Sequence, residues 1–420
     1  MYDLKKGYEV AKEFYAQYGI DVDKAIEVVN STPISMHCWQ GDDVGGFEKK
    51  DDSSLSGGIQ ATGNYPGKAR TADELRADIE EAMKYIPGEL KLNLHANYQE
   101  ADTFVDRNAI EPKHFEKWAD WAVEKGIGLD FNPTYFSHPL SSNGTLSAAD
   151  DKVREFWIEH GIRSRKIGEY FYQRTGKPCV INHWTPDGDK EVPVDTIAPR
   201  QRLKDSYDKI FEATKDVKGV IDGIESKVFG IGLESYTVGS HEFCMGYVMK
   251  ANKDHIIMTL DTGHYHPTEV VSAKLASIYT FSDNVLLHVS RPVRWDSDHV
   301  VSFDDETRAI MEELVRMDKL KDTYIATDFF DASINRICAW VIGLRNTRKA
   351  MLAALLQPVD EMKKIEASGD VSGRLAYKEE FKAAPFALVW DYYCAQQNKG
   401  VGLEWLEEVR KYEKDVLSAR

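Results

Sequence analysis

The chain has 420 residues, of which 42% are hydrophobic and 29% charged, and its formal net charge is −16. This composition is typical of a globular enzyme, and no stretch approaches the ~20 apolar residues of a membrane-spanning helix. A surface so negative repels nucleic-acid phosphates and anionic membranes, so we expect neither as a partner.

The first 20 residues carry charges throughout and have no continuous apolar core, unlike a signal peptide. We therefore expect a cytoplasmic protein. Five scattered cysteines without a CxxC pair argue against a disulfide framework or a cysteine-based zinc site.

Short apolar runs typical of β-strands alternate with helical patterns from residue 32 onward. In chain order, the predicted strands cover residues 32–40, 90–98, 126–135, 179–184, 219–229, 255–261, 284–290 and 323–330. Predicted helices cover residues 71–86, 111–126, 147–176, 200–217, 268–279 and 304–318. This alternation predicts an α/β fold with a parallel sheet, most simply closed into a (β/α)₈ TIM barrel. A doubly wound open sheet is the alternative, although no GxGxxG motif follows the first strand.

The same patterns divide the chain into three parts. We predict an N-terminal helical segment (1–30), a catalytic barrel (31–345) and a C-terminal helical extension (346–420) that packs on the barrel or on a partner subunit. Residues 41–70 are rich in Gly, Ser and Asp and predict a long loop after the first strand, and loops of this length are often functional.

Polar side chains stand at the end of every predicted strand. In a TIM barrel the active site lies at the carboxyl ends of the strands, here called the mouth. In chain order the strand ends carry His37 and Trp39; His95 and Asn97; Asp130 and Asn132; Asn182, His183 and Trp184; Glu225 and Lys227; Asp261 and His264; His288, with Asp296 and Asp298 in its loop; and Asp328. One such residue alone is more often a turn former or a hydrogen-bond partner than a catalytic group. Several carboxylates buried together at one rim, however, require a compensating cation.

The types of ligand narrow the choice of metal. Oxygen-rich sites with one or two imidazoles suit Mn²⁺, Co²⁺ or Mg²⁺. Six or seven ligands are too many for one tetrahedral zinc ion, so we predict two divalent cations that share a carboxylate. Asp261 is the natural bridge because its strand also supplies His264. Asp296 and Asp298 are alternate residues of one loop and could reach the same ion as His264.

Five stretches resemble the L-rhamnose isomerase family, which belongs to the xylose isomerase-like superfamily of metal-dependent sugar isomerases. They are ISMHCWQGDDVGGFE, GIESKVFGIGLESYTVGSHEF, LDTGHYHPTE, RPVRWDSDHVV and TDFFDASINRI, and the resemblance runs over nearly the whole chain. Xylose isomerases proper carry Glu at the position of Asp261 and Asp at the position of His288. Both departures agree with the rhamnose enzymes.

The resemblance implies an aldose–ketose isomerase that interconverts L-rhamnose and L-rhamnulose by a metal-assisted 1,2-hydride shift. It implies two cations, with Mn²⁺ favoured over Co²⁺, Mg²⁺ and Zn²⁺, and a homotetramer. The substrate-anchoring ion would be held by Glu225, Asp261, His288 and Asp328, and the catalytic ion by Asp261, His264, Asp296 and Asp298. Glu234 competes with Glu225 as the ligand from the fifth strand. We prefer Glu225 because Lys227 follows it in the family's Glu-x-Lys pattern.

The remaining candidates have roles toward the sugar. The predicted catalytic residues are Lys227, His95, Asp296 and Asp328, and the predicted substrate-binding residues are Trp184, Trp39, Phe131, His183 and His264. Lys227 would donate to O1 and polarise the carbonyl, or else form a structural ion pair. His95 would assist ring opening, or else be a core histidine bound to a backbone carbonyl. Trp184, Trp39 and Phe131 would form an apolar wall against the 6-methyl group.

Several alternatives stay open on the residues alone. A two-metal barrel hydrolase or phosphodiesterase would use the same ligands, but few basic residues besides Lys227, Arg291 and Arg294 are available for a phosphate. A barrel with purely structural ions would serve as a scaffold or sugar-binding protein. The sequence also leaves open the preferred aldose, and whether Lys227 or a metal-held water moves the proton.

Overall fold

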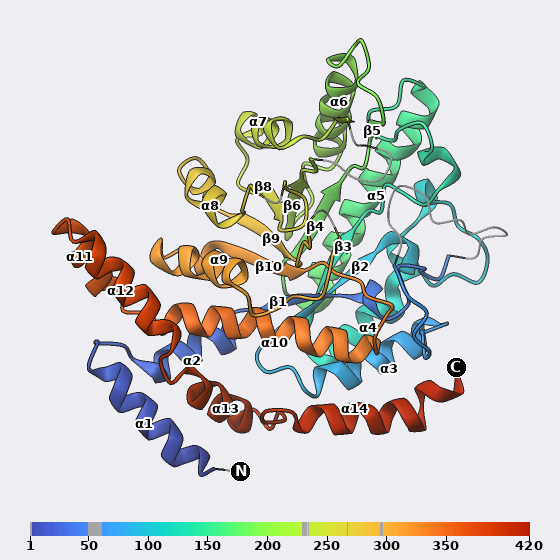
Figure 1. Cartoon of the computed structure of the whole chain (residues 1–420). Helices are drawn as coiled ribbons and strands as arrows, with labels where there is room; N and C mark the ends of the chain where they lie inside the picture. Colours follow the sequence, from blue (N-terminus) through green and yellow to red (C-terminus); the bar gives the residue numbers. More distant parts are fainter. Residues whose placement is uncertain (1, 49–60, 229–232, 234, 267, 295–296) are drawn as a thin grey trace.

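The computed structural model describes residues 2–48, 61–228, 233, 235–266, 268–294 and 297–420. Its central feature is a closed barrel of eight parallel strands (Figure 1). These are β1 (Ile34–His37), β2 (Leu90–His95), β3 (Gly128–Asn132), β4 (Cys179–Trp184), β6 (Val220–Glu225), β8 (Ile256–Asp261), β9 (Val285–Val289) and β10 (Thr323–Thr327). They follow the order β1-β10-β9-β8-β6-β4-β3-β2, so the predicted (β/α)₈ TIM barrel is confirmed and the open sheet is excluded.

Fourteen α-helices lie in the described part of the chain. They are α1 (Leu4–Ala16), α2 (Val22–Ser31), α3 (Ala72–Met83), α4 (Glu116–Lys125), α5 (Asp151–Thr175), α6 (Ala198–Ala213), α7 (His241–Ala251), α8 (Ser272–Tyr279), α9 (Asp305–Arg316), α10 (Arg336–Leu355), α11 (Val359–Ala367), α12 (Val371–Lys382), α13 (Phe386–Gln396) and α14 (Glu404–Asp415). Helix α3 begins as its sequence predicts, because the side chain of Thr71 accepts a hydrogen bond from the backbone N–H of Glu74. Helix α7 has no counterpart among the predicted elements, whereas α11 to α14 lie within the predicted C-terminal helical extension.

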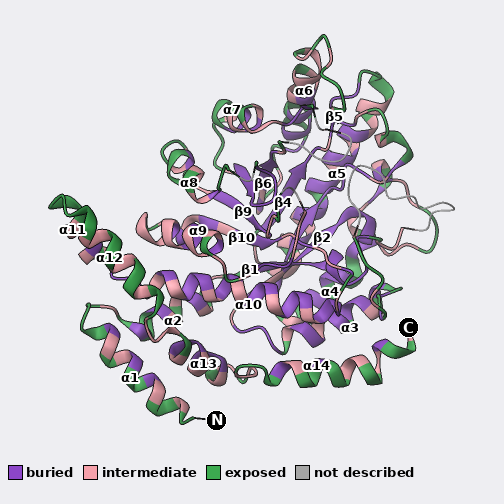
Figure 2. Ribbon diagram, viewed as in Figure 1, coloured by how far each residue is buried: buried purple, intermediate pink, exposed green. Residues whose placement is uncertain are grey.

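The barrel strands are buried on both faces, one inside the barrel and the other against helices, as all-parallel sheets require. Figure 2 shows buried residues concentrated on these strands and exposed residues on the outer helices. Side chains alternate between the two faces, so residues two apart on one strand point the same way. This alternation decides which residues at a strand end can reach the mouth.

The N-terminal helices pack against helices of the C-terminal region outside the barrel. Helix α10 packs against α2, α3 and α9, and α13 packs against α1 (Figure 1). Tyr8 of α1 stacks on Tyr392 of α13 with ring centroids 3.9 Å apart. No helix in the described ranges is long and apolar enough to cross a membrane.

A second, two-stranded sheet lies outside the barrel. Strands β5 (Gly188–Asp189) and β7 (Tyr236–Thr237) pair antiparallel, with Gly188 opposite Thr237. A Cβ atom on Gly188 would lie 2.3 Å from the carbonyl oxygen of Tyr236, so only glycine allows this approach. The small sheet joins the loop after β4 to the loop after β6, and both loops lie at the mouth.

Candidate active site

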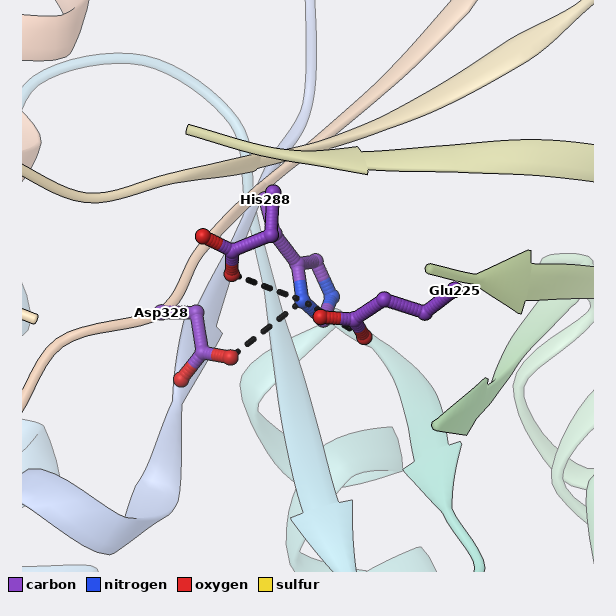
Figure 3. A group of neighbouring side chains, drawn as sticks. Glu225, His288 and Asp328 are labelled. Atoms are coloured by element: carbon purple, nitrogen blue, oxygen red, sulfur yellow. Dashed lines mark ion pairs between the residues drawn. The ribbon is translucent and has the colours of Figure 1, made fainter. Parts of the chain in front are cut away.

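A buried group of four side chains lies at the mouth, and we call it the four-residue group. Glu225 and Asp261 end their strands, His288 is the fourth residue of β9, and Asp328 directly follows β10. One ligand atom from each lies within 4.8 Å of the others. Figure 3 shows Glu225, His288 and Asp328 pointing toward one another from different strands, with His288 Nδ1 3.3 Å from Asp328 Oδ2 and 3.5 Å from Glu225 Oε2. The strands bring these residues together because they all run toward the same face.

The four-residue group contains three carboxylates and one imidazole, so its negative charge is only partly balanced. Burial and the negative charges of Asp328 and Glu225 raise the pKa of the Asp261 carboxyl well above its usual range. Burial acts to lower the pKa of His288, but the charges of Glu225 and Asp328 outweigh it and raise that pKa. Burial also opposes ionisation of Asp328, but its close contact with the positively charged His288 ring outweighs this and lowers the pKa of Asp328 to about 2.

The four-residue group fits a divalent cation. Asp261 Oδ2 and both ring nitrogens of His288 are buried without a hydrogen-bond partner among the described residues. Buried polar atoms rarely stay unpaired, and three carboxylates around one imidazole leave excess negative charge. A divalent ion bound by oxygen and imidazole ligands would satisfy both conditions.

A second group, here the three-residue group, shares Asp261 and adds His264 and Asp298. Asp261 Oδ1 accepts a hydrogen bond of 2.6 Å from the backbone N–H of Gly263, which orients this shared carboxylate. His264 Nδ1 lies 2.9 Å from Glu225 Oε1, so the two groups are contiguous. Asp296, predicted as a ligand here, and Glu234, the rival of Glu225, lie outside the described residues.

Lys227 lies beside the three-residue group. Its Nζ atom is 3.5 Å from His264 Nε2 and 4.9 Å from the centroid of the Trp184 ring. The backbone of Lys227 is held from both sides, because its N–H donates to Gly239 O at 3.0 Å and its carbonyl accepts from Thr237 Oγ1 at 3.0 Å. The small sheet therefore fixes the base of this side chain, a support that the sequence did not indicate.

Aromatic rings surround the groups at the mouth. The indole N–H of Trp39 donates to Asp328 Oδ1 at 3.0 Å, and the Trp39 ring meets His95 edge-on with centroids 4.1 Å apart. Phe136 lies between His95 and Trp184, with centroid distances of 5.6 and 5.3 Å. Phe136 was not among the predicted wall residues. It stands four residues beyond β3, where no strand alternation indicates its direction.

Two predicted substrate-binding residues, His183 and Phe131, do not reach the four-residue or the three-residue group. His183 Nε2 lies 3.0 Å from Asp222 Oδ1, and the His183 ring packs against Tyr207 and Phe211 of α6. Phe131 packs edge-on against Phe115 and Phe171 of the outer layer.

Strand alternation explains where these two side chains point. Asn182 donates to Glu225 of the neighbouring strand β6 inside the barrel and shares its strand face with Trp184. The intervening His183 must therefore face the helices. Phe131 stands between Asp130 and Asn132 on β3, and the same rule turns it outward.

Comparison with known proteins gives a consistent result. The family model described as L-rhamnose isomerase (RhaA) matches residues 2–420. Curated proteins named L-rhamnose isomerase from Escherichia coli (strain SMS-3-5 / SECEC) and Escherichia fergusonii are 56% and 55% identical to the chain over 418 residues, covering 99% of each partner. Among solved structures, an L-ribulose 3-epimerase matches with a TM-score of 0.50 and 12% identity, covering 76% of this chain and 95% of that one. At such identity the structural likeness concerns the fold alone.

Proposed function

The chain belongs to the L-rhamnose isomerase family and interconverts L-rhamnose and L-rhamnulose, and from this premise we propose that it does so by a 1,2-hydride shift with two bound divalent cations. The single observation that carries the proposal is the four-residue group, buried, rich in carboxylates and joined through Asp261 to a second such group. Family membership sets aside the hydrolase and the structural-ion alternatives.

We propose that Glu225, Asp261, His288 and Asp328 hold one ion and that Asp261, His264 and Asp298 hold the other. Asp296 joins the second set on its sequence position, two residues before Asp298. Mn²⁺ is the proposed metal because oxygen ligands with one imidazole per ion suit it. When bound, the cations supply Lewis-acid stabilisation of negative charge on O1 and O2 of the sugar.

The reaction moves one hydride and one proton. In the aldose-to-ketose direction, the C2 hydrogen moves with its electron pair to C1, while the O2 proton moves to O1. We propose that Lys227 donates a hydrogen bond to O1 and so increases the positive character of C1 that accepts the hydride. The contact of Lys227 Nζ with the Trp184 ring supports this, because the ring holds the ammonium group beside the three-residue group.

The aromatic wall has two proposed tasks. Trp39, Phe136 and Trp184 exclude water from the reacting carbons and provide apolar contact for the 6-methyl group. We propose Phe136 for this wall in place of Phe131, which packs outward. His95, next to Trp39, accepts a hydrogen bond from a hydroxyl of the cyclic sugar and assists ring opening.

Three broader features are also part of the proposal. The division into residues 1–30, 31–345 and 346–420 is retained, although α10 begins at Arg336 and crosses the second boundary. A homotetramer is proposed on the family resemblance. A reducing, cytoplasmic compartment is proposed because all five cysteines are free thiols.

The test uses L-rhamnose deuterated at C2. Chelator-treated protein should form no ketose, and added Mn²⁺ should restore formation. The product should carry deuterium at C1, because a hydride shift transfers this atom directly. Loss of the deuterium to solvent would contradict the hydride shift, and full activity of the chelated protein would contradict the bound cations.

A further inference from the structure

Thr134 contacts His95 from the loop that follows β3. Its Oγ1 atom lies 3.0 Å from three different atoms: the backbone nitrogen of Ala96, the backbone oxygen of Asn132 and Nδ1 of His95. Thr134 is fully buried, so bulk solvent does not reach this hydroxyl. The three contacts therefore depend only on which of the four partners, the Thr134 hydroxyl, the Ala96 amide, the Asn132 carbonyl and the His95 ring, carries each proton.

The backbone of Thr134 is held in an unusual conformation. Its φ angle is +62°, a region that β-branched residues rarely adopt and that persists only where the surroundings enforce it. The N–H of Thr134 donates to Asn132 Oδ1 at 3.1 Å, and the carbonyl of Thr134 accepts from Arg107 Nη1 at 2.6 Å. Next to it, the carbonyl oxygen of Pro133 lies 2.5 Å from His160 Nε2. These contacts hold the turn so that the hydroxyl faces His95.

Counting protons assigns the tautomer of His95. A threonine hydroxyl has one proton to donate and two lone pairs that accept. The amide of Ala96 only donates, and the carbonyl of Asn132 only accepts. If Thr134 gave its proton to His95 Nδ1, its oxygen would face the Asn132 carbonyl at 3.0 Å without a proton between them. All three contacts are hydrogen bonds only when Thr134 donates to Asn132 and His95 Nδ1 carries a proton that it donates to Thr134.

We propose that Thr134 is a positioning residue that fixes His95 as the Nδ1-protonated tautomer, leaving Nε2 as the acceptor for a hydroxyl of the cyclic sugar. The functional half of this inference rests on the ring-opening role proposed for His95. In the opposite tautomer, Nε2 would be an N–H donor and could not accept that hydroxyl. Burial lowers the pKa of His95 to about 3, which keeps the ring neutral and makes the tautomer the property that matters.

The direct test is ¹⁵N NMR of protein labelled at histidine, loaded with diamagnetic Mg²⁺ so that the metal does not broaden the signals. The His95 signals are identified by their loss in His95→Gln. We expect a protonated Nδ1 and an unprotonated Nε2 in the wild type, and the same pattern in Thr134→Ser, which keeps a hydroxyl. Thr134→Val, which keeps the branched shape, should lose the single tautomer. A protonated Nε2 in the wild type, or an unchanged pattern in Thr134→Val, would overturn the assignment.

Steady-state kinetics of the same variants test whether the tautomer of His95 matters for the reaction. Partners that orient the imidazole ligands of metal sites are commonly worth about 10- to 100-fold in activity, and we expect a comparable fall in kcat on L-rhamnose in Thr134→Val, with KM little changed. Thr134→Ser should recover most of the loss. Thr347→Val is the control, because it removes another fully buried hydroxyl, which donates to the carbonyl of Gly343 in α10, and kcat should stay at the wild-type value.

The tautomer of His95 and its role in ring opening are refuted by different results. Wild-type kcat in His95→Gln would overturn the role proposed for His95, and the functional half of the inference with it, whatever the tautomer. Wild-type kcat in Thr134→Val with a changed tautomer would overturn the functional half alone. If Thr134→Val does not fold, the tautomer measured in the wild type and in Thr134→Ser still decides the assignment.

Discussion

Replacing Trp39 with Phe should weaken metal binding without removing a metal ligand. The indole N–H of Trp39 donates to Asp328 Oδ1 at 3.0 Å, while His288 Nδ1 lies 3.3 Å from the other carboxylate oxygen. Trp39→Phe keeps an aromatic ring near His95 and removes the donor together with part of the buried ring, a loss of volume that the Trp184→Phe control shares. The carboxylate of Asp328 would then be oriented from one side alone.

The size of the effect follows from the charge on the acceptor. A hydrogen bond to an ionised group contributes about 1.5–3 kcal/mol. Because the ion-pair contact between His288 and Asp328 remains, we expect the lower part of this range, about 1.5–2 kcal/mol. At about 1.4 kcal/mol for each factor of ten, the dissociation constant for the ion at the four-residue group should rise about 10- to 30-fold.

Calorimetric titration of chelator-treated protein with Mn²⁺ measures this constant. An Asp298→Ala background leaves the four-residue group intact and simplifies the binding curve. Trp184→Phe is the matched control, since Trp184 Nε1 has no hydrogen-bond partner in the described ranges, and its affinity should equal that of the background. An unchanged constant in Trp39→Phe, or an equal loss in Trp184→Phe, would refute the reasoning.

Three further predictions concern metal stoichiometry, the C-terminal contact and acid stability. Asp261→Ala should lose both ions and Asp298→Ala only one, because Asp261 belongs to both groups; bound metal is counted by mass spectrometry. Arg420→Met should lower the free energy of unfolding by about 3 kcal/mol, because it removes the charged partner of the buried Asp78 carboxylate, which accepts from Arg420 Nη1 at 2.5 Å and, within the described residues, keeps only the Tyr412 hydroxyl as a donor. Between pH 7 and pH 5, the free energy of unfolding should fall by about 2 kcal/mol for each imidazole whose pKa burial lowers to about 3 or 4. These imidazoles are His37, His95 and His160.

The sign of the pH effect follows from the lowered pKa values. The unfolded chain takes up protons on these imidazoles below about pH 6.5, whereas the native protein does so only near pH 3 to 4. Equal urea midpoints at pH 7 and pH 5 would contradict this prediction. For Arg420, the control is Arg410→Met, whose exposed pair with Glu407 should be worth less than about 1 kcal/mol. Two bound ions in Asp261→Ala would disprove the shared carboxylate.

The barrel could be predicted because each of its strands is a short apolar run between helical patterns. Helix α7 was missed because HEFCMGYVMKA carries apolar residues around its whole circumference, so no periodic stripe marks it as a helix. Strands β5 and β7 have two residues each, too few for any alternation. They form through the close approach that Gly188 permits, a contact between segments far apart in the chain.

The candidate site likewise contains residues that the sequence could place and residues that it could not. Parallel strands end on one face, so the order of elements alone places Glu225, Asp261 and Asp328 together. Applied to single residues, strand alternation would have predicted that His183 and Phe131 face away from the mouth. Phe136 and Thr134 could not be placed by either rule, because both follow β3 in a loop whose path depends on contacts from other segments.

The pairing of the first and last barrel strands has a consequence during synthesis. Strand β1 pairs with β10, and His37 and Thr327, which are 290 residues apart, meet there with 2.8 Å between His37 Nδ1 and Thr327 Oγ1. A ribosome adds about 5–20 residues per second, so the first strand waits about 15–60 s for this partner. Throughout that time one edge of β1 has unpaired backbone groups, and an open edge can recruit a strand from another nascent chain. The protein should therefore be most prone to aggregation while it is still being translated, and chaperones that bind nascent chains should raise its yield more than later refolding assistance.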